Sequence, residues 1–325
     1  ANRNMIINGA MQISQRATSA TGKTTGGYYT VDRFQNQFGN LGTWTVTQEA
    51  DGPAGFASSW KIDCTTADAS PAAGDHVFAT YALEGFDCQS WKKGTASAES
   101  LTLSFWVKSY QTGTWQVNLR DYNNNRLVGG TYTVNATATW EYKTITFPAD
   151  TTGAITNNSS ANVAMEMWMG SGTDYSSGAV PTAWETRANT DRNAGSTIQL
   201  GDSTNNYWQI TGVQLEIGDT ATPFEHKTYG QELAACQRYC QKASTTTPYT
   251  GPCTNGVTFG GEIYFANYFR GTPTVTTAHV TSSYFPGTTP TAGTIQKGKF
   301  YCTKTADGTS SVGYFRMSWT ADAEL

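Results

Sequence analysis

Residues 208–225 read Trp-Gln-Ile-Thr-Gly-Val-Gln-Leu-Glu-Ile-Gly-Asp-Thr-Ala-Thr-Pro-Phe-Glu, and the passage runs on to Cys-Gln-Arg-Tyr at 236–239. Its first half alternates apolar and polar residues, which predicts a β-strand. The Gly-Asp pair predicts a turn, and the proline ends an extended stretch because it cannot donate a ladder hydrogen bond. A helix is predicted over 229–242. Its apolar stripe consists of Leu233, Cys236, Tyr239 and Cys240.

The same alternation recurs along most of the chain, in stretches rich in Val, Thr, Tyr and Trp that are bounded by Gly, Asn and Asp. It predicts strands over 42–49, 58–64, 76–83, 100–109, 113–121, 127–134, 141–147, 162–170 and 207–217, and then over 256–266, 274–280, 294–303 and 311–320. Many strands with short, turn-rich links are typical of a two-sheet sandwich or jelly roll.

We therefore predict an all-β chain with three parts: a jelly-roll β-sandwich over 1–228, a connecting helix over 229–244, and a small C-terminal β domain over 245–325. The Thr/Pro/Gly-rich stretch 245–253 is either a linker or a first edge strand.

Composition excludes some classes of function. Charged residues make up 14% of the 325-residue chain, whereas about 25% is typical of soluble domains. The net charge is −4, so binding to a nucleic-acid backbone, which needs clustered Lys and Arg, is not predicted. No apolar run of about 18 residues is present, so no membrane insertion is predicted. The first residues lack the blocks of a signal peptide, which fits either release by lysis or a processed secreted chain.

The cysteines and acidic residues predict no cofactor. Six cysteines are too sparse for a disulfide scaffold in a chain of this length, and we predict buried, reduced thiols. Cys236, Cys240 and Cys253 raise the question of a metal site, but no CxxC pair or nearby His supports one. A structural Ca²⁺ could take oxygen ligands from Asp32, Glu216 and Asp219, although stabilisation of turns by these carboxylates is the favoured interpretation.

Several stretches, read together, resemble one family. Besides 208–239, they are residues 4–16 with 29–34, 104–109 with 113–120, and 139–153. In sequence and order these stretches resemble bacteriophage tail-fibre and related virion proteins that carry a jelly-roll domain similar to carbohydrate-binding modules. The resemblance covers roughly residues 4–240, and a weaker one includes 270–276.

The resemblance implies a protein of the virion surface, assembled in the host cytoplasm and carried on a tail or head fibre. It also implies partners: host-surface polysaccharide, other virion proteins, and further copies of the chain in a homo-oligomer, most simply a trimer. Family members carry the domain behind a trimeric stalk. This chain shows no coiled-coil heptads, which indicates either a fragment or a compact tip mounted on another virion protein.

A candidate binding face follows from strand alternation, because successive side chains point to opposite faces. In 101–108, 115–120 and 163–169, one face is apolar and the other carries polar and Trp side chains. If these strands share one sheet, its outer face combines Trp106, Trp168, Gln116, Asn118, Arg120 and Glu166. Flat Trp rings can stack on sugar faces while amides and charges bind hydroxyls, which is the chemistry of a glycan site. The alternative is that a helix, a loop or another subunit covers this face.

The loop 171–187 is a second candidate, because Tyr175 and Trp184 lie in a long Gly/Ser-rich segment, where binding residues often occur. The alternative interpretation is that Trp184 pins the loop to the sheet.

Catalysis is not predicted. Glycan-cleaving enzymes use two positioned carboxylates, and no acidic residue here forms a persuasive motif. The three histidines, His76, His226 and His279, are scattered, and neither GxSxG nor HExxH is present. We read His226 as interfacial.

Three hypotheses remain in order of preference. The first is a non-catalytic protein that attaches a phage to host glycans through many weak sites. The second is a structural decoration or adaptor of the capsid or tail, which predicts that the face with Trp106 and Trp168 is covered by protein. The third is a depolymerase, which predicts an exposed cleft with two carboxylates about 5–10 Å apart.

Overall fold

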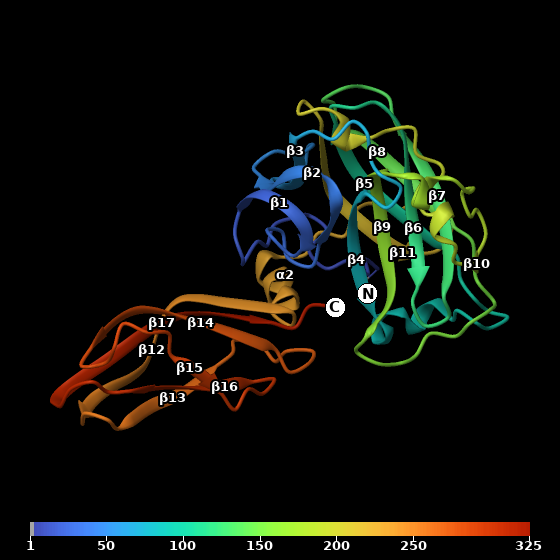
Figure 1. Cartoon of the computed structure of the whole chain (residues 1–325). Coiled ribbons are helices and arrows are strands. Elements are labelled where there is room, and N and C mark those ends of the chain that lie inside the picture. Colours follow the sequence, from blue (N-terminus) through green and yellow to red (C-terminus); the bar gives the residue numbers. More distant parts are fainter. Residues whose placement is uncertain (1–2) are drawn as a thin grey trace. The chain divides into compact units, whose positions relative to one another are not determined.

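The computed structural model describes residues 3–325. The chain forms two compact units (Figure 1), of which the first runs to Glu232 and also includes Leu325, and the second is Leu233–Glu324. The second unit thus begins inside the helical segment, rather than at residue 245.

The first unit is built almost wholly of antiparallel strands (Figure 1). Its elements are β1 (Ser19–Gly27), β2 (Gln35–Glu49), β3 (Ser59–Thr66), β4 (His76–Glu84), η1 (Gly85–Trp91), β5 (Leu101–Ser109), β6 (Gly113–Asp121), β7 (Arg126–Val134), β8 (Glu141–Phe147), β9 (Ala161–Ser171), α1 (Thr173–Ser176), β10 (Glu185–Thr186), η2 (Asn189–Asp191), η3 (Leu200–Asp202) and β11 (Tyr207–Ile217). Every strand predicted in this unit is present. The strand β1 was missed because its sequence, SATGKTTGG, has no apolar alternation, and β10 is too short to show one.

The strands follow the order β10-β7-β6-β9-β4-β2-β3-β11-β5-β8, with β1 added beside β2. Residues 35–40 of β2 pair with β4, whereas residues 43–49 pair with β3. Between the two parts, Asn40 and Gly42 have φ of 58° and 71°, so β2 bends from one layer into the other. We call the strands on the β4 side layer one and those on the β3 side layer two. Since the chain crosses between layers after β3, β4, β5, β7, β8 and β10, the first unit is an all-β sandwich with jelly-roll connections.

The core lies between the two layers. Phe105 on β5 meets Tyr132 on β7 with ring centroids 5.0 Å apart. The indole N–H of Trp208 on β11 donates to the Tyr132 hydroxyl at 3.0 Å, and burial raises the pKa of this tyrosine. Each layer therefore presents its apolar face to the other, and the polar tip of a core tyrosine is satisfied across the sandwich.

The second unit starts within α2 (Tyr229–Cys236) and continues through β12 (Cys240–Cys253), β13 (Thr258–Tyr264), β14 (Thr274–Ser283), β15 (Thr291–Gly293), β16 (Lys299–Thr305) and β17 (Ser310–Asp322). Its strands form two antiparallel sheets, β12-β17-β14 and β13-β16-β15. Aromatic side chains dominate its core, including Phe265, Phe300, Phe315 and Trp319.

Two sequence predictions for this region need correction. The helix predicted over 229–242 ends at Cys236, because Cys240 opens β12 and bonds in register to β17. The strand predicted over 294–303 begins only at Lys299, and residues 291–293 form β15 instead. The stretch 245–253 belongs to β12 at a sheet edge, so the edge-strand alternative was correct, and its prolines are tolerated there.

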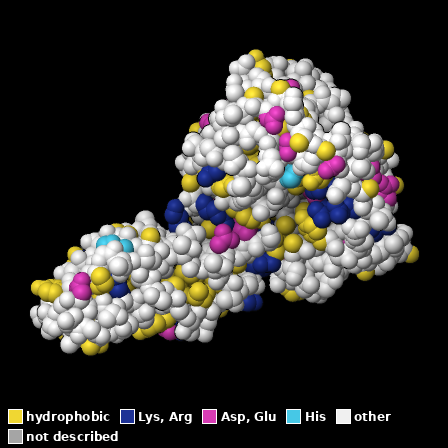
Figure 2. Space-filling model, in the orientation of Figure 1, with side chains coloured by type: hydrophobic (Ala, Val, Ile, Leu, Met, Phe, Trp, Pro, Cys, Tyr) yellow, Lys and Arg dark blue, Asp and Glu magenta, His cyan; other side chains and the backbone are white. Residues whose placement is uncertain are grey.

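Charged side chains are sparse on the face shown in Figure 2, where they form small separate groups among uncharged polar side chains and backbone. Within residues 3–325, no helix has the length and apolar character needed to cross a membrane.

Candidate functional site: an aromatic groove around Trp106

The predicted alternation is correct on each strand. Phe105 and Val107 are buried in the core, while Trp106 between them is only partly buried on the outer face of β5. Met165 and Met167 likewise point inward on β9, opposite Glu166 and Trp168. Gln116, Asn118 and Arg120 on β6 share an outer face with Glu166 on β9, since Asn118 pairs with Glu166.

The prediction that Trp106 and Trp168 lie on the same outer face of one sheet is wrong. Trp106 lies on β5 in layer two, whereas Trp168 lies on β9 in layer one. Alternation reveals which way a side chain points from its own strand, but the layer to which that strand belongs depends on the bend in β2 and on pairing between distant segments.

The outer face of β6 and β9 is covered by the chain's own segment 172–199. The Gln116 amide donates to the Asp191 carbonyl at 2.8 Å and accepts from the Gly195 N–H at 2.7 Å. The Asn118 amide donates to the Arg192 carbonyl at 2.7 Å. Both amides are buried, so they bind backbone rather than a ligand.

Arg192 fastens the segment 172–199 to β9. Its guanidinium forms a bidentate pair with Glu166, at 3.0 and 2.8 Å, and lies over the rings of Trp168 and Tyr175 at 4.8 and 5.4 Å. Trp168 is 0% exposed. The glycan role predicted for Gln116, Asn118, Glu166 and Trp168 is therefore contradicted, because a sugar has no access to them. Arg120 is the exception, since its side chain is 24% exposed.

The loop residues have structural partners. Half-buried Tyr175 packs on Trp168 at 5.2 Å between ring centroids. The indole N–H of Trp184 donates to the Pro148 carbonyl at 2.9 Å, and the Lys93 ammonium lies 4.9 Å from its ring. The structure thus shows Trp184 pinning its loop, as the alternative interpretation proposed.

The open aromatic surface is instead the outer face of layer two. A groove of about 460 Å³, which we call the Trp106 groove, lies over β5 and β11. It is lined by Phe56, Ser104, Trp106, Tyr142, Gly212, Pro223, Phe224 and His226.

Aromatic rings form two sides of the Trp106 groove. Trp106 and Tyr142, from neighbouring strands β5 and β8, lie 5.3 Å apart between centroids. Phe56 meets Phe224 edge-on at 5.0 Å, and His226 packs on Phe224 at 4.8 Å. Tyr142 is 44% exposed, so part of this aromatic surface is open to solvent.

A β-bulge makes room for the groove. The register between β11 and β5 shifts after Thr211, and Gly212 there has φ of 63°. A Cβ on this glycine would lie 2.8 Å from the Phe56 ring and 3.2 Å from the Trp106 ring. Only glycine combines this left-handed backbone with so close an approach of both rings.

The loop that carries Phe56 is fastened to the sheet. The Thr211 hydroxyl donates to the Ser58 carbonyl at 2.7 Å, and the Gln209 amide donates to the Asp51 carboxylate at 3.1 Å. Lys108 on β5 forms an ion pair with the same carboxylate, and its hydrogen bond holds the pKa of Asp51 below the ordinary value. Asp51 therefore stays ionised at neutral pH, and the groove wall is positioned before any ligand arrives.

Sequence reasoning found Trp106 but missed Phe56, Tyr142 and Phe224, and it read His226 as interfacial. The signal for Phe224 and His226 was present, because Phe224 lies within the Pro-Phe-Glu passage and His226 follows it directly. Phe56 lies in the irregular loop 50–58, where no periodicity marks its direction.

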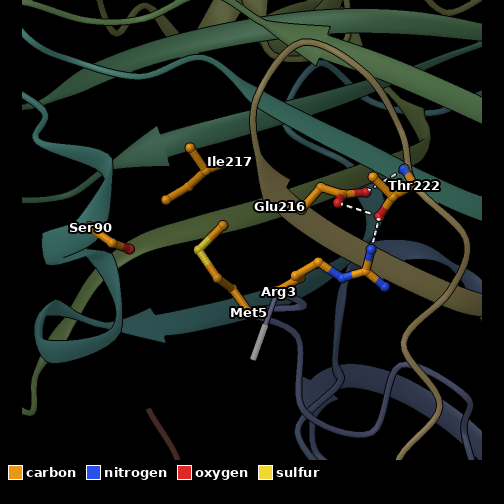
Figure 3. Close-up of a pocket in the computed structure, with 6 residues that line it drawn as sticks. All are labelled: Arg3, Met5, Ser90, Glu216, Ile217 and Thr222. Carbon is orange, nitrogen blue, oxygen red and sulfur yellow. Dashed lines mark hydrogen bonds between the residues drawn. The ribbon is translucent and has the colours of Figure 1, made fainter. Parts of the chain in front are cut away.

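A smaller cavity of about 330 Å³ (Figure 3) contains one candidate calcium ligand, Glu216. The Thr222 hydroxyl and N–H donate to the Glu216 carboxylate at 2.6 and 2.8 Å, while Arg3 donates to Thr222 at 2.9 Å. Although burial acts in the opposite direction, these hydrogen bonds lower the pKa of Glu216. In Figure 3 the polar groups turn toward one another, with Met5 and Ile217 on the other side, which is the arrangement of a stabilised turn.

The other two candidate calcium ligands, Asp32 and Asp219, do not join Glu216 in a common site. Asp32 accepts hydrogen bonds from the Gln15 backbone and side chain, and Asp219 is exposed. Over residues 3–325, no group of three or more His, Cys, Asp or Glu side chains is placed to hold a metal ion. All six cysteines are buried, and burial raises the pKa of both the Cys64 and Cys302 thiols to about 11, which makes them unreactive at neutral pH.

No protein-family model matches the chain, and no curated protein matches it. Remote likenesses exist among solved structures. The enzymatically active domain of tailspike protein 4 from bacteriophage CBA120 has 13% identity and a TM-score of 0.33, over 66% of this chain and 21% of that chain. A putative sugar-binding protein from Bacteroides thetaiotaomicron has 11% identity and a TM-score of 0.37, over 66% of this chain and 100% of that chain.

The family 11 carbohydrate-binding module from Clostridium thermocellum, solved with a mixed-linked tetrasaccharide, has 10% identity and a TM-score of 0.30, over 63% of this chain and 98% of that chain. This chain therefore spans about a fifth of the tailspike domain but nearly all of the two smaller proteins. The two-layer fold of this chain follows from its own strand order.

Proposed function

We propose that the first unit binds a polysaccharide, without cleaving it, in the Trp106 groove. The observation that carries the proposal is a solvent-accessible groove in which Trp106 and Tyr142 lie beside a second aromatic group around Phe224. A pyranose ring has apolar faces that pack on such rings and hydroxyls that need neutral hydrogen-bond partners. Tyr142 and His226 offer such partners in the same lining.

The composition of the groove supports a non-catalytic role. Its lining includes no carboxylate, whereas glycoside hydrolysis needs an acid and a second carboxylate. The adjacent Asp51 is engaged by Lys108, which lowers its pKa. A carboxyl group that acts as a general acid at neutral pH needs a raised pKa instead.

The wider setting that we propose is the virion surface of a bacteriophage. It is supported by the resemblance of 4–16, 104–120 and 208–239 to tail-fibre sequences. The partners would be a host-surface polysaccharide and other virion proteins. A trimeric assembly would place several grooves on one particle, so that weak single-site binding gains strength through effective concentration.

Trp106→Ala tests the proposal directly. Removing the indole deletes a large stacking surface, so affinity for a bound polysaccharide should fall about tenfold or more, as measured by calorimetry on glycans first selected from a panel of bacterial surface polysaccharides. Because Trp106 is only partly buried, the thermal unfolding midpoint should change little. The matched control is Phe86→Ala, which removes an exposed aromatic ring on η1 and should leave binding unchanged.

Equal binding by wild type and a folded Trp106→Ala protein would place the receptor site elsewhere. If the wild-type chain bound no member of the panel, even when multimerised on beads, the alternative of a decoration or adaptor protein would be preferred. Release of soluble sugar by the wild type would overturn the non-catalytic part of the proposal.

A further inference from the structure

The second unit has a cavity of its own, formed of polar and aromatic side chains. Its volume is about 320 Å³, and it lies where the end of β13 faces the turn before β16. The lining residues are Tyr264, Tyr268, Gln296, Lys297, Gly298 and Lys299.

The two tyrosines are unusually exposed. Tyr264 and Tyr268 are 68% and 77% exposed, more than any other large hydrophobic side chain within residues 3–325. Each tyrosine is followed directly by a phenylalanine, Phe265 or Phe269, that is buried in the core of the unit. The phenylalanines anchor the backbone, and the tyrosine rings are left facing water, where covering them would be favourable.

Both walls of the cavity are tied together by backbone hydrogen bonds. The Phe265 N–H donates to the Gly298 carbonyl and the Phe269 N–H to the Lys297 carbonyl, each at 3.0 Å. A Cβ at Gly298 would lie 2.9 Å from the Tyr268 ring, so this ring rests directly on the glycine backbone. The cavity is thus preorganised, which lowers the entropic cost of binding.

Charge in the cavity favours an anion. No acidic residue lines it, whereas two lysines do. Glu262, beside the cavity, accepts from the Lys299 ammonium and from the Tyr264 hydroxyl, both at 2.5 Å. This carboxylate neutralises the charge of Lys299 and fixes the position of the Tyr264 hydroxyl. The exposed Lys297 then gives the lining a net positive charge.

We propose that this cavity is a second saccharide-binding site, specific for an acidic glycan segment. A sugar ring packs on Tyr264 and Tyr268, and its carboxylate or phosphate substituent meets the Lys297 ammonium. The first unit would then hold a neutral stretch of polysaccharide and the second unit an anionic one. This inference is independent of the Trp106 groove, since it rests on residues of the second unit alone.

The test is affinity electrophoresis of the full chain through gels that contain polygalacturonate, a phosphodiester-linked teichoic acid, or neutral dextran. Wild type should be retarded by an anionic polymer, and the polymer that retards it identifies carboxylate or phosphate as the anion. Trp106→Ala, which lacks the main ring of the first unit's groove, should not be retarded by dextran. Tyr268→Ala should weaken this retardation about tenfold. Lys297→Gln should weaken it several-fold and reduce its dependence on salt, because an exposed charge is screened.

Three controls separate this site from other causes. Tyr284→Ala removes an exposed tyrosine of the same unit that does not line the cavity and should bind as wild type does. Tyr268→Phe keeps the ring and should retain most binding, which ties the loss in Tyr268→Ala to the ring rather than to a folding defect. Trp106→Ala should leave retardation by the anionic polymer unchanged, so failure of this proposal and failure of the Trp106 groove can be told apart.

The inference is overturned if neither anionic polymer retards the wild type, if dextran retards Trp106→Ala as strongly as the anionic polymers do, or if Tyr268→Ala and Lys297→Gln bind as wild type does. It is also overturned if sedimentation shows that the wild type self-associates and folded Tyr268→Ala does not, since the tyrosines would then form an interface between copies.

Discussion

Lys93 shows how a single residue organises charges inside a chain that carries few of them. Its side chain is 3% exposed, and its ammonium donates to Asp121 at 2.6 Å and to the carbonyl oxygens of Thr152 and Gly153 at 3.1 and 2.9 Å. Asp150 lies 2.9 Å from the same ammonium. One buried cation therefore connects the end of β6 with the loop that follows β8.

Replacing Lys93 with Met should destabilise the first unit by about 3–5 kcal/mol, because the carboxylates of Asp121 and Asp150 would be left buried without this cation. The adjacent Lys92 is a matched control, since its side chain is 53% exposed and pairs with exposed Glu99. Lys92→Met should change stability by less than about 1 kcal/mol. Denaturant unfolding of both variants measures the difference, and equal effects would show that the buried network contributes no more than a surface pair.

At the scale of elements, the bulge in β11 decides where the Trp106 groove can exist. A regular strand would keep β11 in register with β5 beyond Thr211, but the shift there places Gly212 beneath the rings of Phe56 and Trp106. The loop 50–58 supplies one wall, and the segment after β11 supplies the other. The groove thus joins segments that are distant in sequence at a single irregularity of one strand.

Gly212→Ala should therefore impair the groove more than it impairs the fold. The added Cβ must displace the Phe56 ring, so affinity for the polysaccharide should fall about tenfold. Gly22→Ala is the control, because Gly22 has a similar φ of 65° with nothing within 4 Å of the added Cβ. It should cost about 1 kcal/mol from the left-handed backbone and leave binding intact. Loss of binding in both variants would attribute the effect to general destabilisation.

For the whole molecule, the response to acid follows from a few carboxylates. Hydrogen bonds and ion pairs hold their pKa below the ordinary values of 3.8 for Asp and 4.5 for Glu. Although burial acts in the opposite direction, hydrogen bonds from Lys143 and the Asn135–Ala136 turn bring the pKa of Glu141 down to about 2. The carboxylates lowered in this way are Asp51, Glu141, Asp150, Glu216 and Glu225.

A carboxyl group whose pKa is lowered by folding binds its proton more weakly in the folded chain than in the unfolded chain. It therefore stabilises the fold fully above its ordinary pKa, and this contribution is lost as the pH falls through its pKa in the folded chain. The free energy of unfolding of the first unit should thus be steady from pH 7 to about 5 and decline between about pH 4 and 2. Glu232, whose pKa is raised by burial, acts in the opposite direction. Denaturant titrations across this range measure the slope. It should be shallower near pH 3 in Glu141→Gln, and stability that rose on acidification would contradict the assignment.

Strand positions and side-chain directions could be predicted because they are local. The alternation in 101–107 and 163–169 placed Phe105 and Met165 inside and Trp106 outside, and the structure agrees. The length of α2 could not be predicted in this way, because Cys240 is drawn into β12 by its pairing with β17. Pairing of that kind depends on residues far along the chain rather than on helical periodicity.

By itself the sequence determined that this chain is all-β, with little charge and an aromatic residue at 106 facing outward, since each of these follows from composition or from the two-residue period of a strand. Only the tertiary structure decided which outward face is open. Arg192 and the backbone of 191–195 cover Trp168, Gln116 and Asn118, whereas nothing in residues 3–325 closes the groove at Trp106. Contacts such as Arg192 with Glu166, or Phe56 with Phe224, join irregular loops to distant strands, and such loops carry no periodic pattern from which their docking could be foreseen.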